Sequence, residues 1–463
     1  MSDPSTPASS PAPPSKTWSV GTLTYTSATL AVLFAWLLLG DFAWSMRDRS
    51  AAPLAQWYLK HLETPNLLYA LIISTFPNAL GFVISPIISY KSDRHRGRFG
   101  RRIPYLLVTT PIAALGMIGM GLCPVIAPWL HDLLGTHSPG PKSIALVVFA
   151  VFWAVFSIAT VAAKAVFGGL VNDVVPPLFI GRFYGLFRAI SLLDGIIFSY
   201  WIFGLVDTAY THIFCAIGLL YGIGFLWVCL KVKEGDYPPP PPADPARPGP
   251  LGSFAAGART YARECFSNPY YIGVFIMIMF GLLAFIPVNT FNIPFARSLG
   301  MSMETYGRCV AVTYLISFSL SYFMGWLADA FHPMRVAMGC LLFYAAVAAW
   351  GAMYATTPQT FGVAIVLHGV ASGCYFTSAA SLGQKLYPHS RYAQFDSASD
   401  AIGSVAIMAT GPAVGLLIDA TGDSYRHAYA VGSVLSLLAL GSAFFVHARF
   451  VRLGGVRSYV APE

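Results

Sequence analysis

Four ionisable side chains lie inside long apolar stretches of the sequence, where a charge is costly. They are Asp41, Lys164, Asp194 and Asp400. A charge at the centre of a membrane helix costs about 2.5–3.5 kcal/mol on insertion scales, so such a residue is expected to face a cavity and to have a partner. A carboxylate whose pKa changes with burial, or with the loss of a cationic partner, can bind and release a proton. Asp41, Asp194 and Asp400 are therefore the candidates for proton coupling.

Lys164 is the only lysine or arginine in the middle of its apolar stretch. One interpretation is that its long side chain reaches the membrane surface. The other is that it faces a cavity, contacts a substrate and pairs with Asp194. Arg188, six residues before Asp194, is an alternative partner for that carboxylate. Both interpretations remain open from the sequence alone.

Aromatic and amide side chains supply a second kind of chemistry. Leu37, Asp41 and Trp44 share one helix face by their spacing, which brings a carboxylate and an indole together. This combination suits a sugar, whose C–H faces are apolar and whose hydroxyls are polar. The alternative is an interfacial Trp44 beside a water-exposed Asp41.

The segment Pro287–Pro294 contains two asparagines, Asn289 and Asn292, on one helix face between two prolines. Amide side chains bind neutral hydroxyls without requiring charge, so these are candidate substrate contacts, and helix–helix hydrogen bonding is the alternative. Asn78 is a weaker candidate of the same kind. His368 is a lone imidazole in an apolar stretch and is either a protonatable substrate contact or a packing residue.

Composition sets the class of protein. Of 463 residues, 56% are apolar and only 10% are charged, whereas soluble proteins carry about a quarter charged residues. The chain is therefore expected to be a polytopic membrane protein. Its seven cysteines form no CxxC pair, which argues against a disulfide framework or a zinc site. We expect no metal, no cofactor, no nucleic-acid partner and no enzymatic activity, because phosphate-binding loops and nucleophile–base signatures are missing.

Twelve segments are apolar and long enough to span a membrane, which predicts an all-α membrane protein. A proline-rich stretch, 232–266, separates two sets of six and reads as a semi-rigid linker. We therefore expect a disordered tail over 1–20, six-helix bundles over 21–231 and 267–450, and a second tail over 451–463. The expected helices are roughly 21–44, 66–90, 103–125, 143–170, 182–206, 211–231, 269–295, 303–329, 334–355, 360–386, 393–418 and 426–448.

The distribution of positive charge predicts the orientation. With both termini in the cytoplasm, 20 of the 28 lysines and arginines lie on the cytoplasmic side. This bias follows the positive-inside rule, so we expect a multi-pass protein of the cell (inner) membrane with both termini cytoplasmic. Lys164 lies within a helix, and seven positive residues fall outside: Arg47, Arg49, Lys60, Lys142, Arg297, Arg308 and Arg426.

A basic turn, Ser92–Arg102, separates two apolar stretches and has a weaker counterpart in the second half. Asp93 ends one predicted helix, and Asp329 ends the equivalent helix of the second half. Gly181–Phe187 and Ser390–Phe395 likewise open equivalent helices with an arginine followed by an aromatic residue. Two such matches predict duplicated, pseudo-symmetric six-helix bundles with a binding site between them near mid-membrane.

The basic turn also carries a family resemblance. The pattern Tyr90-Lys91-Ser92-Asp93-Arg94, followed by Arg98-Phe99-Gly100-Arg101-Arg102, resembles the major facilitator superfamily and, within it, the sucrose-transporter branch and the related glycoside–pentoside–hexuronide:cation symporters. The resemblance implies twelve helices and a charge latch that closes the cytoplasmic side in the outward-facing state. The alternative for the turn is a solvated anchor for anionic lipid. The latch candidates are Asp93, Arg94, Arg101, Arg102, Arg182, Asp329 and Arg391.

These observations predict a secondary active transporter that moves a sugar or glycoside by alternating access, coupled to H⁺, with Na⁺ as the alternative coupling ion. The expected partners are a small carbohydrate substrate, the coupling ion and the lipid bilayer, and one chain is expected to act as a monomer. The alternatives are a transporter of organic anions or drugs, for which Lys164 and Arg188 would suit a carboxylate, and a transporter-like sensor that binds without moving its ligand.

Overall fold

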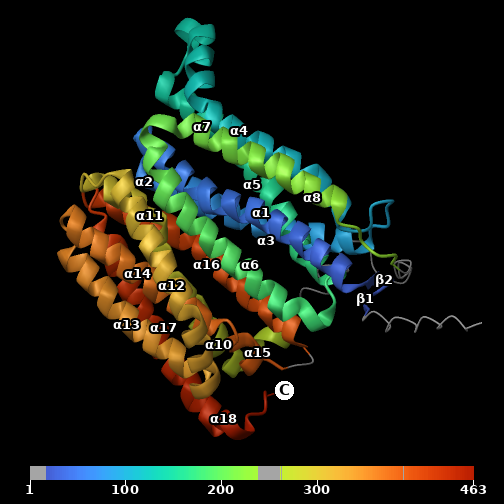
Figure 1. Cartoon of the computed structure of the whole chain (residues 1–463). Helices are drawn as coiled ribbons and strands as arrows, with labels where there is room; N and C mark the ends of the chain where they lie inside the picture. Colours follow the sequence, from blue (N-terminus) through green and yellow to red (C-terminus); the bar gives the residue numbers. More distant parts are fainter. Residues whose placement is uncertain (1–16, 238–260, 262, 389–390, 463) are drawn as a thin grey trace, which may run out of the picture.

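The computed structural model describes residues 17–237, 261, 263–388 and 391–462. The predicted N-terminal tail up to residue 16 and most of the proline-rich linker lie outside these residues. The described chain begins with a short antiparallel hairpin, β1 (Trp18–Val20) and β2 (Leu23–Tyr25), and is otherwise helical. Figure 1 shows the first half of the chain, blue to green, beside the second half, yellow to red.

The first half starts with a very long helix and ends with a broken one. Short π and 3₁₀ segments (η) interrupt several of its helices. The elements are α1 (Ser27–His61), α2 (Asn66–Ala70), η1 (Leu71–Thr75), α3 (Phe76–Arg94), α4 (Ile103–Leu134), η2 (Gly135–His137), α5 (Pro141–Val174), α6 (Pro177–Ile197), η3 (Phe198–Ile202), η4 (Phe203–Leu205), α7 (Val206–Leu219), η5 (Leu220–Phe225) and α8 (Leu226–Lys231).

The second half repeats the pattern with fewer interruptions. Its first membrane crossing is broken in two at Ala284–Phe285, just before the Pro287–Pro294 segment singled out in the sequence. The elements are α10 (Pro269–Leu283), α11 (Ile286–Ser298), α12 (Met303–Phe331), α13 (Pro333–Tyr354), α14 (Pro358–Ala379), α15 (Leu382–Leu386), α16 (Tyr392–Ala420), α17 (Arg426–Arg452) and α18 (Gly455–Ser458).

The described residues contain eleven helical runs that are long and apolar enough to cross a membrane. One of them, Pro177–Lys231, has 55 residues and would be roughly 80 Å long if straight, against an apolar membrane core of about 30 Å. It is interrupted at η4 and again at Ala209, whose φ of −127° is not helical. In Figure 1, α7 and α8 run back in the direction opposite to α6 and lie beside α4. This run therefore accounts for two crossings, and the predicted twelve-helix fold class is confirmed.

The first helix differs most from its prediction. The sequence predicts an end near residue 44, but α1 continues to His61. Its N-terminus is fixed by a capping box between Thr26 and Thr29. The charged stretch Asp41–Ser50 is followed by the apolar stretch Ala51–Leu59, most of which is buried, so the helix gains packing by continuing.

The extension of α1 corrects the assignment of two arginines to the outside loops. Arg47 is fully buried inside the first half, where it pairs with Asp48 and lies over the rings of Trp44 and Tyr221. Arg49 is half-buried and faces the second half. Both residues therefore belong to the interior of the bundle.

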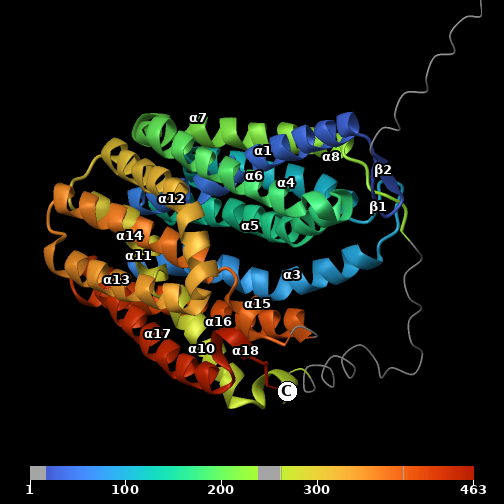
Figure 2. The same cartoon turned by 60° about the horizontal axis from the view of Figure 1, so that its bottom comes forward.

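The two halves meet along two seams. The run α2–η1–α3 packs against α16, and α6, η3 and η4 pack against α12. Figure 2 shows α3 beside α16 and α6 beside α12 from a second direction. The second seam needs small residues, because a Cβ on Gly307 would lie 2.2 Å from the carbonyl oxygen of Ser199. Only glycine permits that approach.

We call the end of the bundle that carries β1, β2 and α18 the termini end, and the opposite end the far end. The hydrogen bonds that join the two halves lie at the far end and at mid-depth. At the far end, for example, Arg297 donates to the carbonyl oxygen of Trp57 at 3.2 Å, and Tyr69 donates to that of Thr290 at 2.7 Å. The described conformation is thus closed at its far end.

Candidate functional site

A cavity of about 460 Å³ lies between the two halves at mid-depth. Helices α1 and α6 supply its wall on one side, and α11, α12 and α14 supply the wall on the other. Its volume falls within the range of small-molecule sites. Among the predicted substrate contacts, Asn289, Asn292 and His368 line this cavity. It also contains two arginines, Arg49, which was not predicted as a substrate contact, and Arg188, which the sequence suggested only for the organic-anion alternative.

Arg49 connects the halves across this cavity. Its Nε and one terminal nitrogen donate to Ser191, to the carbonyl oxygen at 3.2 Å and to the hydroxyl at 2.8 Å. Its other terminal nitrogen donates to the Tyr314 hydroxyl at 3.2 Å, and the guanidinium lies over the Tyr314 ring. The ring comes this close because residue 195 is glycine, since a Cβ there would lie 2.8 Å from it.

Two of the predicted proton-coupling carboxylates lie behind Arg49. Asp194 is 0% exposed and Asp41 is 5% exposed. Both oxygens of Asp194 and one oxygen of Asp41 have no hydrogen-bond partner in the described structure. The two carboxylates act on one another electrostatically, and Arg49 acts on both. An unpartnered buried carboxylate is costly and marks a functional group more often than a structural one.

His368 organises the second-half wall of the cavity. It is 2% exposed. Its Nε2 lies 3.0 Å from Asn289 Oδ1, and its Nδ1 lies 3.0 Å from the Tyr344 hydroxyl. When Nε2 carries the ring proton, it donates to the carbonyl oxygen of Asn289, and the amide nitrogen of Asn289 has no hydrogen-bond partner among the described residues. Asn292 also lines the cavity and accepts from the backbone of Ile293.

Two predicted substrate contacts do not reach the cavity. Trp44 is buried inside the first half, where it stacks on Phe167 with 4.8 Å between ring centroids. Trp44 therefore does not act as the predicted sugar contact in this cavity, because α1 continues past residue 44 and places Trp44 in mid-helix. Asn78 donates to the carbonyl oxygen of Ser74 at 2.7 Å within its own helix and is not among the cavity-lining residues.

Lys164 and Asp400 lie on opposite halves and act on one another electrostatically. Both side chains are exposed. The groups that act on Asp194 are instead Asp41 and Arg49, so the predicted pairing of Lys164 with Asp194 is wrong. Arg188 interacts with Arg49 and Tyr314, which also removes it as the partner of Asp194.

The basic turn between α3 and α4 forms a charge cluster at the termini end. Arg102 pairs with Asp93 at 2.5 Å and with Asp173 at 3.3 Å. Arg101 pairs with Asp173 at 2.5 Å rather than with Asp93. Asp93 is 54% exposed at its side chain. All four residues belong to the first half, so in this conformation the cluster does not join the halves.

Glu234, just after α8, fixes the N-terminus of α4. Its carboxylate accepts from the backbone amides of Arg101, Arg102 and Ile103 at 2.7–2.9 Å. Acids are favoured at this place because the helix N-terminus carries unpaired N–H groups. Glu234 also accepts from Tyr237, and burial raises the pKa of that phenol. The start of the inter-half linker is thereby tied to the basic turn.

The other latch candidates are dispersed. Arg94 lies over the ring of Tyr90, and Arg391 lies near that of Phe395. Asp329 is exposed and forms no ion pair with any residue that the structure describes. The side chain of Arg182 lies outside the described part of the chain.

A polar cluster centred on Asn66 closes the far end. Asn66 is 1% exposed. Its side-chain nitrogen donates to Asp419 at 2.7 Å and to Asp423 at 2.6 Å on the second half. Its oxygen accepts from Lys60 at 2.5 Å and from Tyr425 at 3.0 Å. We call these five residues the far-end lock.

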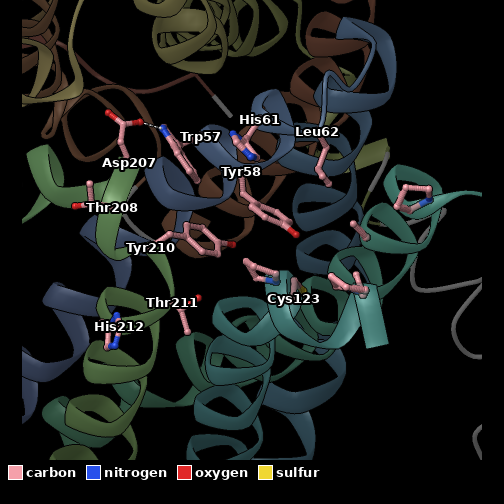
Figure 3. Close-up of a pocket in the computed structure, with 15 residues that line it drawn as sticks. Trp57, Tyr58, His61, Leu62, Cys123, Asp207, Thr208, Tyr210, Thr211 and His212 are labelled. Carbon is pink, nitrogen blue, oxygen red and sulfur yellow. Dashed lines mark hydrogen bonds between the residues drawn. The ribbon is translucent and has the colours of Figure 1, made fainter. Parts of the chain in front are cut away.

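A second cavity, of about 400 Å³, lies wholly within the first half near the far end. Figure 3 shows Trp57, Tyr58 and Tyr210 along this cavity. The indole N–H of Trp57 donates to the Asp207 carboxylate at 2.9 Å. Since all of its lining comes from one half, motion between the halves would not open or close it. We therefore place the candidate site in the inter-half cavity.

The sequence contained a signal for Arg49. Ser45, Arg49, Ala52 and Gln56 recur at helical spacing, and an apolar stretch follows the charges. This pattern favours a helix that continues past residue 44 with a polar face. Arg188 was considered as a partner for Asp194 and, in the organic-anion alternative, as a contact for a carboxylate.

Comparison with known proteins agrees with this geometry. Residues 288–455 match the sequence model of the Major Facilitator Superfamily. A bacterial homologue of the human lysosomal transporter Spinster, solved in an inward-facing and unoccupied conformation, superposes with a TM-score of 0.65 over 92% of this chain and 98% of that one, at 15% identity. A D-xylose–proton symporter superposes with a TM-score of 0.61 over 90% and 97%, at 12% identity. The chain has the major facilitator fold.

A weaker similarity joins part of the chain to sugar transporters. A stretch of 100 residues is 33% identical to human proton-associated sugar transporter A. This stretch covers 22% of this chain and 13% of that protein. The mouse protein of the same name is 35% identical over 77 residues, 17% of this chain and 10% of that one. The chain therefore covers a small part of these relatives. Together, the comparisons show the major facilitator fold and a partial sequence similarity to the Major Facilitator Superfamily and to sugar transporters.

Proposed function

We propose that this protein is a secondary active transporter that moves a sugar or glycoside by alternating access, coupled to H⁺. The observation that carries the proposal is the inter-half cavity, which is lined by amide, imidazole and hydroxyl groups and backed by the unpartnered Asp194. Amides and aromatic rings suit a hydroxylated substrate. The partial similarity to proton-associated sugar transporters supports the same substrate class.

Proton coupling follows from the position of Arg49 between the carboxylates and the cavity. Asp41 and Asp194 are like charges that repel one another, and a proton on either removes that repulsion. Arg49 is attracted to both carboxylates, yet it also joins Tyr314 of the second half. Protonation of Asp194 would weaken its hold on Arg49 and favour the contacts in the cavity. Proton occupancy and the contact between the halves are thereby linked.

The positive charge at the termini end favours a cytoplasmic location for that end. In that orientation the described conformation is closed to the outside, through the far-end lock. Closing the termini end would bring Lys164 and Asp400 towards one another, and the basic turn would then contact the second half. This is the alternation that the transport cycle requires.

Uptake into proteoliposomes tests the proposal. Neutral sugars and glycosides are supplied with and without an inward proton gradient, and counterflow is measured without any gradient. We expect gradient-driven accumulation by the native protein. Asp194→Asn should keep counterflow but lose accumulation, whereas Asp132→Asn, an exposed acid at the tip of α4, should behave as the native chain.

Two outcomes would contradict the proposal. If Asp194→Asn accumulates substrate as well as the native protein does, Asp194 is not the coupling group. If the native protein binds sugars but shows no counterflow, it is a sensor rather than a transporter.

A further inference from the structure

We propose that Arg49 and Arg188 form an anion-binding site in the inter-half cavity, so that the transported substrate carries a carboxylate or a phosphate ester. The inference rests on the proposed transport function, because the site lies in the cavity through which a substrate would pass. It adds a charged group to the sugar-like body already proposed.

The charge of the cavity lining is one-sided. Two arginines line the cavity, and no aspartate or glutamate is among the lining residues. A cavity with low-dielectric walls and one sign of charge concentrates ligands of the opposite sign. A neutral sugar would leave both guanidiniums without a counter-charge on the cavity side.

Arg188 is the stronger indication. Its side chain is exposed to the cavity, and it makes no hydrogen bond or ion pair with the described residues. The positive charge that acts on it is Arg49, which repels it. Guanidinium groups bind carboxylates and phosphates through paired N–H donors. An anion between Arg49 and Arg188 would remove the repulsion and occupy donors that the protein leaves free.

The buried carboxylates do not fill this role. Asp41 and Asp194 act on Arg49 from behind the cavity wall, and neither is among the groups that act on Arg188. Arg49 is also held by Ser191 and Tyr314. The charge of Arg188 is therefore left for a ligand.

The opposite wall explains why the ligand should also carry hydroxyls. Asn289, Asn292 and His368 lie across the cavity on the second half. They offer amide and imidazole groups. A substrate with an anionic head at Arg188 and a hydroxylated body at Asn289 would contact both halves at once, as alternating access requires.

Matched probes test this site: D-glucose, D-glucuronate and D-glucose 6-phosphate share one ring and differ in charge. Binding to the purified protein is measured by thermal shift, and uptake is measured in proteoliposomes. We expect at least one acidic probe to bind about tenfold more tightly than glucose. Arg188→Gln should abolish that preference and Arg188→Lys should retain most of it. Arg308→Gln, which removes an exposed arginine outside the cavity lining, should have no effect.

The outcomes separate the two proposals. Glucose uptake driven by the proton gradient, with neither acid bound more tightly, overturns the anion site and leaves the proposed function standing. Acid binding that depends on Arg188, without gradient-driven uptake, supports the anion site and contradicts proton-coupled transport. An acid preference that survives in Arg188→Gln, or no thermal shift with either acid, also overturns the site. Preference for glucuronate over the phosphate, or the reverse, identifies the anionic group.

Discussion

Asp419 in α16 accepts hydrogen bonds from both the backbone amide and the side-chain amide of Asn66, at 3.1 and 2.7 Å, although 353 residues separate them in the sequence. Its other oxygen accepts from the backbone amide of Leu67 at 3.0 Å. One carboxylate from the second half thus caps the helical run that starts at α2 in the first half. This contact holds the far end closed.

Asp419→Asn should therefore open the far end. A hydrogen bond to a charged group contributes about 1.5–3 kcal/mol, so weakening this set should shift the balance between closed and open forms by roughly tenfold or more. The measurement is the labelling rate of a cysteine placed at Gln56, a cavity-lining residue, by an impermeant maleimide added at the far face. Asp132→Asn is the control. An unchanged labelling rate in Asp419→Asn would show that the far-end lock does not depend on this carboxylate.

Asp194 and Asp173 should respond in opposite ways to loss of charge. Asp194 is buried without a partner, whereas Asp173 is paired with Arg101 and Arg102. At pH 8, Asp194→Asn should raise the free energy of unfolding by about 1 kcal/mol, because it removes an uncompensated buried charge. Asp173→Asn should lower it by about 2–3 kcal/mol, because breaking a buried ion pair is costly.

Thermal unfolding in one detergent, followed by tryptophan fluorescence, measures both changes. A melting temperature for Asp194→Asn that falls as far as that of Asp173→Asn would mean that Asp194 is a structural residue. Its role as a proton-coupling group would then lose its physical basis, since functional sites typically sacrifice stability.

The helical content and the order of the crossings could be predicted because each crossing must contain its own apolar stretch, which is a local property. The end of α1 could not be predicted by hydropathy, since Arg47, Asp48 and Arg49 interrupt the apolar pattern. Arg47 and Arg49 are stabilised by contacts with Tyr221 and Ser191 respectively, which are far away in the sequence. The partners of the charged residues are equally hard to predict, because Lys164 and Asp400 act on one another only across the packing of two separate halves.

His332 makes stability depend on pH at the termini end. It lies between α12 and α13, adopts a positive φ of 80°, and accepts from the backbone amide of Met334 through Nδ1. Burial, together with the charges of Lys385 and Arg335, lowers the pKa of His332 to about 4. His447 acts in the same direction. Protonation of Nδ1 would also remove the acceptor that caps α13.

The folded state therefore binds fewer protons at His332 than the unfolded state does between pH 4 and the ordinary histidine value near 6.5. The contribution of neutral His332 to the free energy of unfolding is fully present above about pH 6.5. It is lost as the pH falls towards 4, and the loss is on the order of 2 kcal/mol. His332→Asn keeps a capping oxygen and tolerates positive φ, so it should flatten this dependence. The measurement is the melting temperature between pH 4 and 8, with His212→Asn as the control. The same pH dependence in the native protein, His332→Asn and His212→Asn would contradict the assignment to His332.

His368 should fix the orientation in which the Asn289 amide binds a substrate. The Tyr344 hydroxyl has a single proton and lies 3.0 Å from His368 Nδ1 and 3.2 Å from the carbonyl oxygen of Ala284. If that proton is donated to Nδ1, then Nε2 carries the ring proton and donates to Asn289 Oδ1, and the Asn289 amide is fixed with its N–H groups towards the cavity. Replacing His368 with leucine frees the amide to rotate, so the substrate concentration for half-maximal uptake should rise about tenfold.

Tyr344→Phe is the matched comparison, because it leaves the donation from Nε2 to Asn289 in place and should raise that concentration by a smaller factor. In both variants the maximal uptake rate should change less than the half-maximal concentration, since neither His368 nor Tyr344 is a proposed proton-coupling group. If His368→Leu instead lowers maximal uptake at unchanged affinity, the imidazole acts in the transport cycle and not in holding Asn289. If affinity falls as expected, deoxy sugars can identify the hydroxyl that Asn289 binds. Only the analogue that lacks this hydroxyl should be insensitive to His368→Leu.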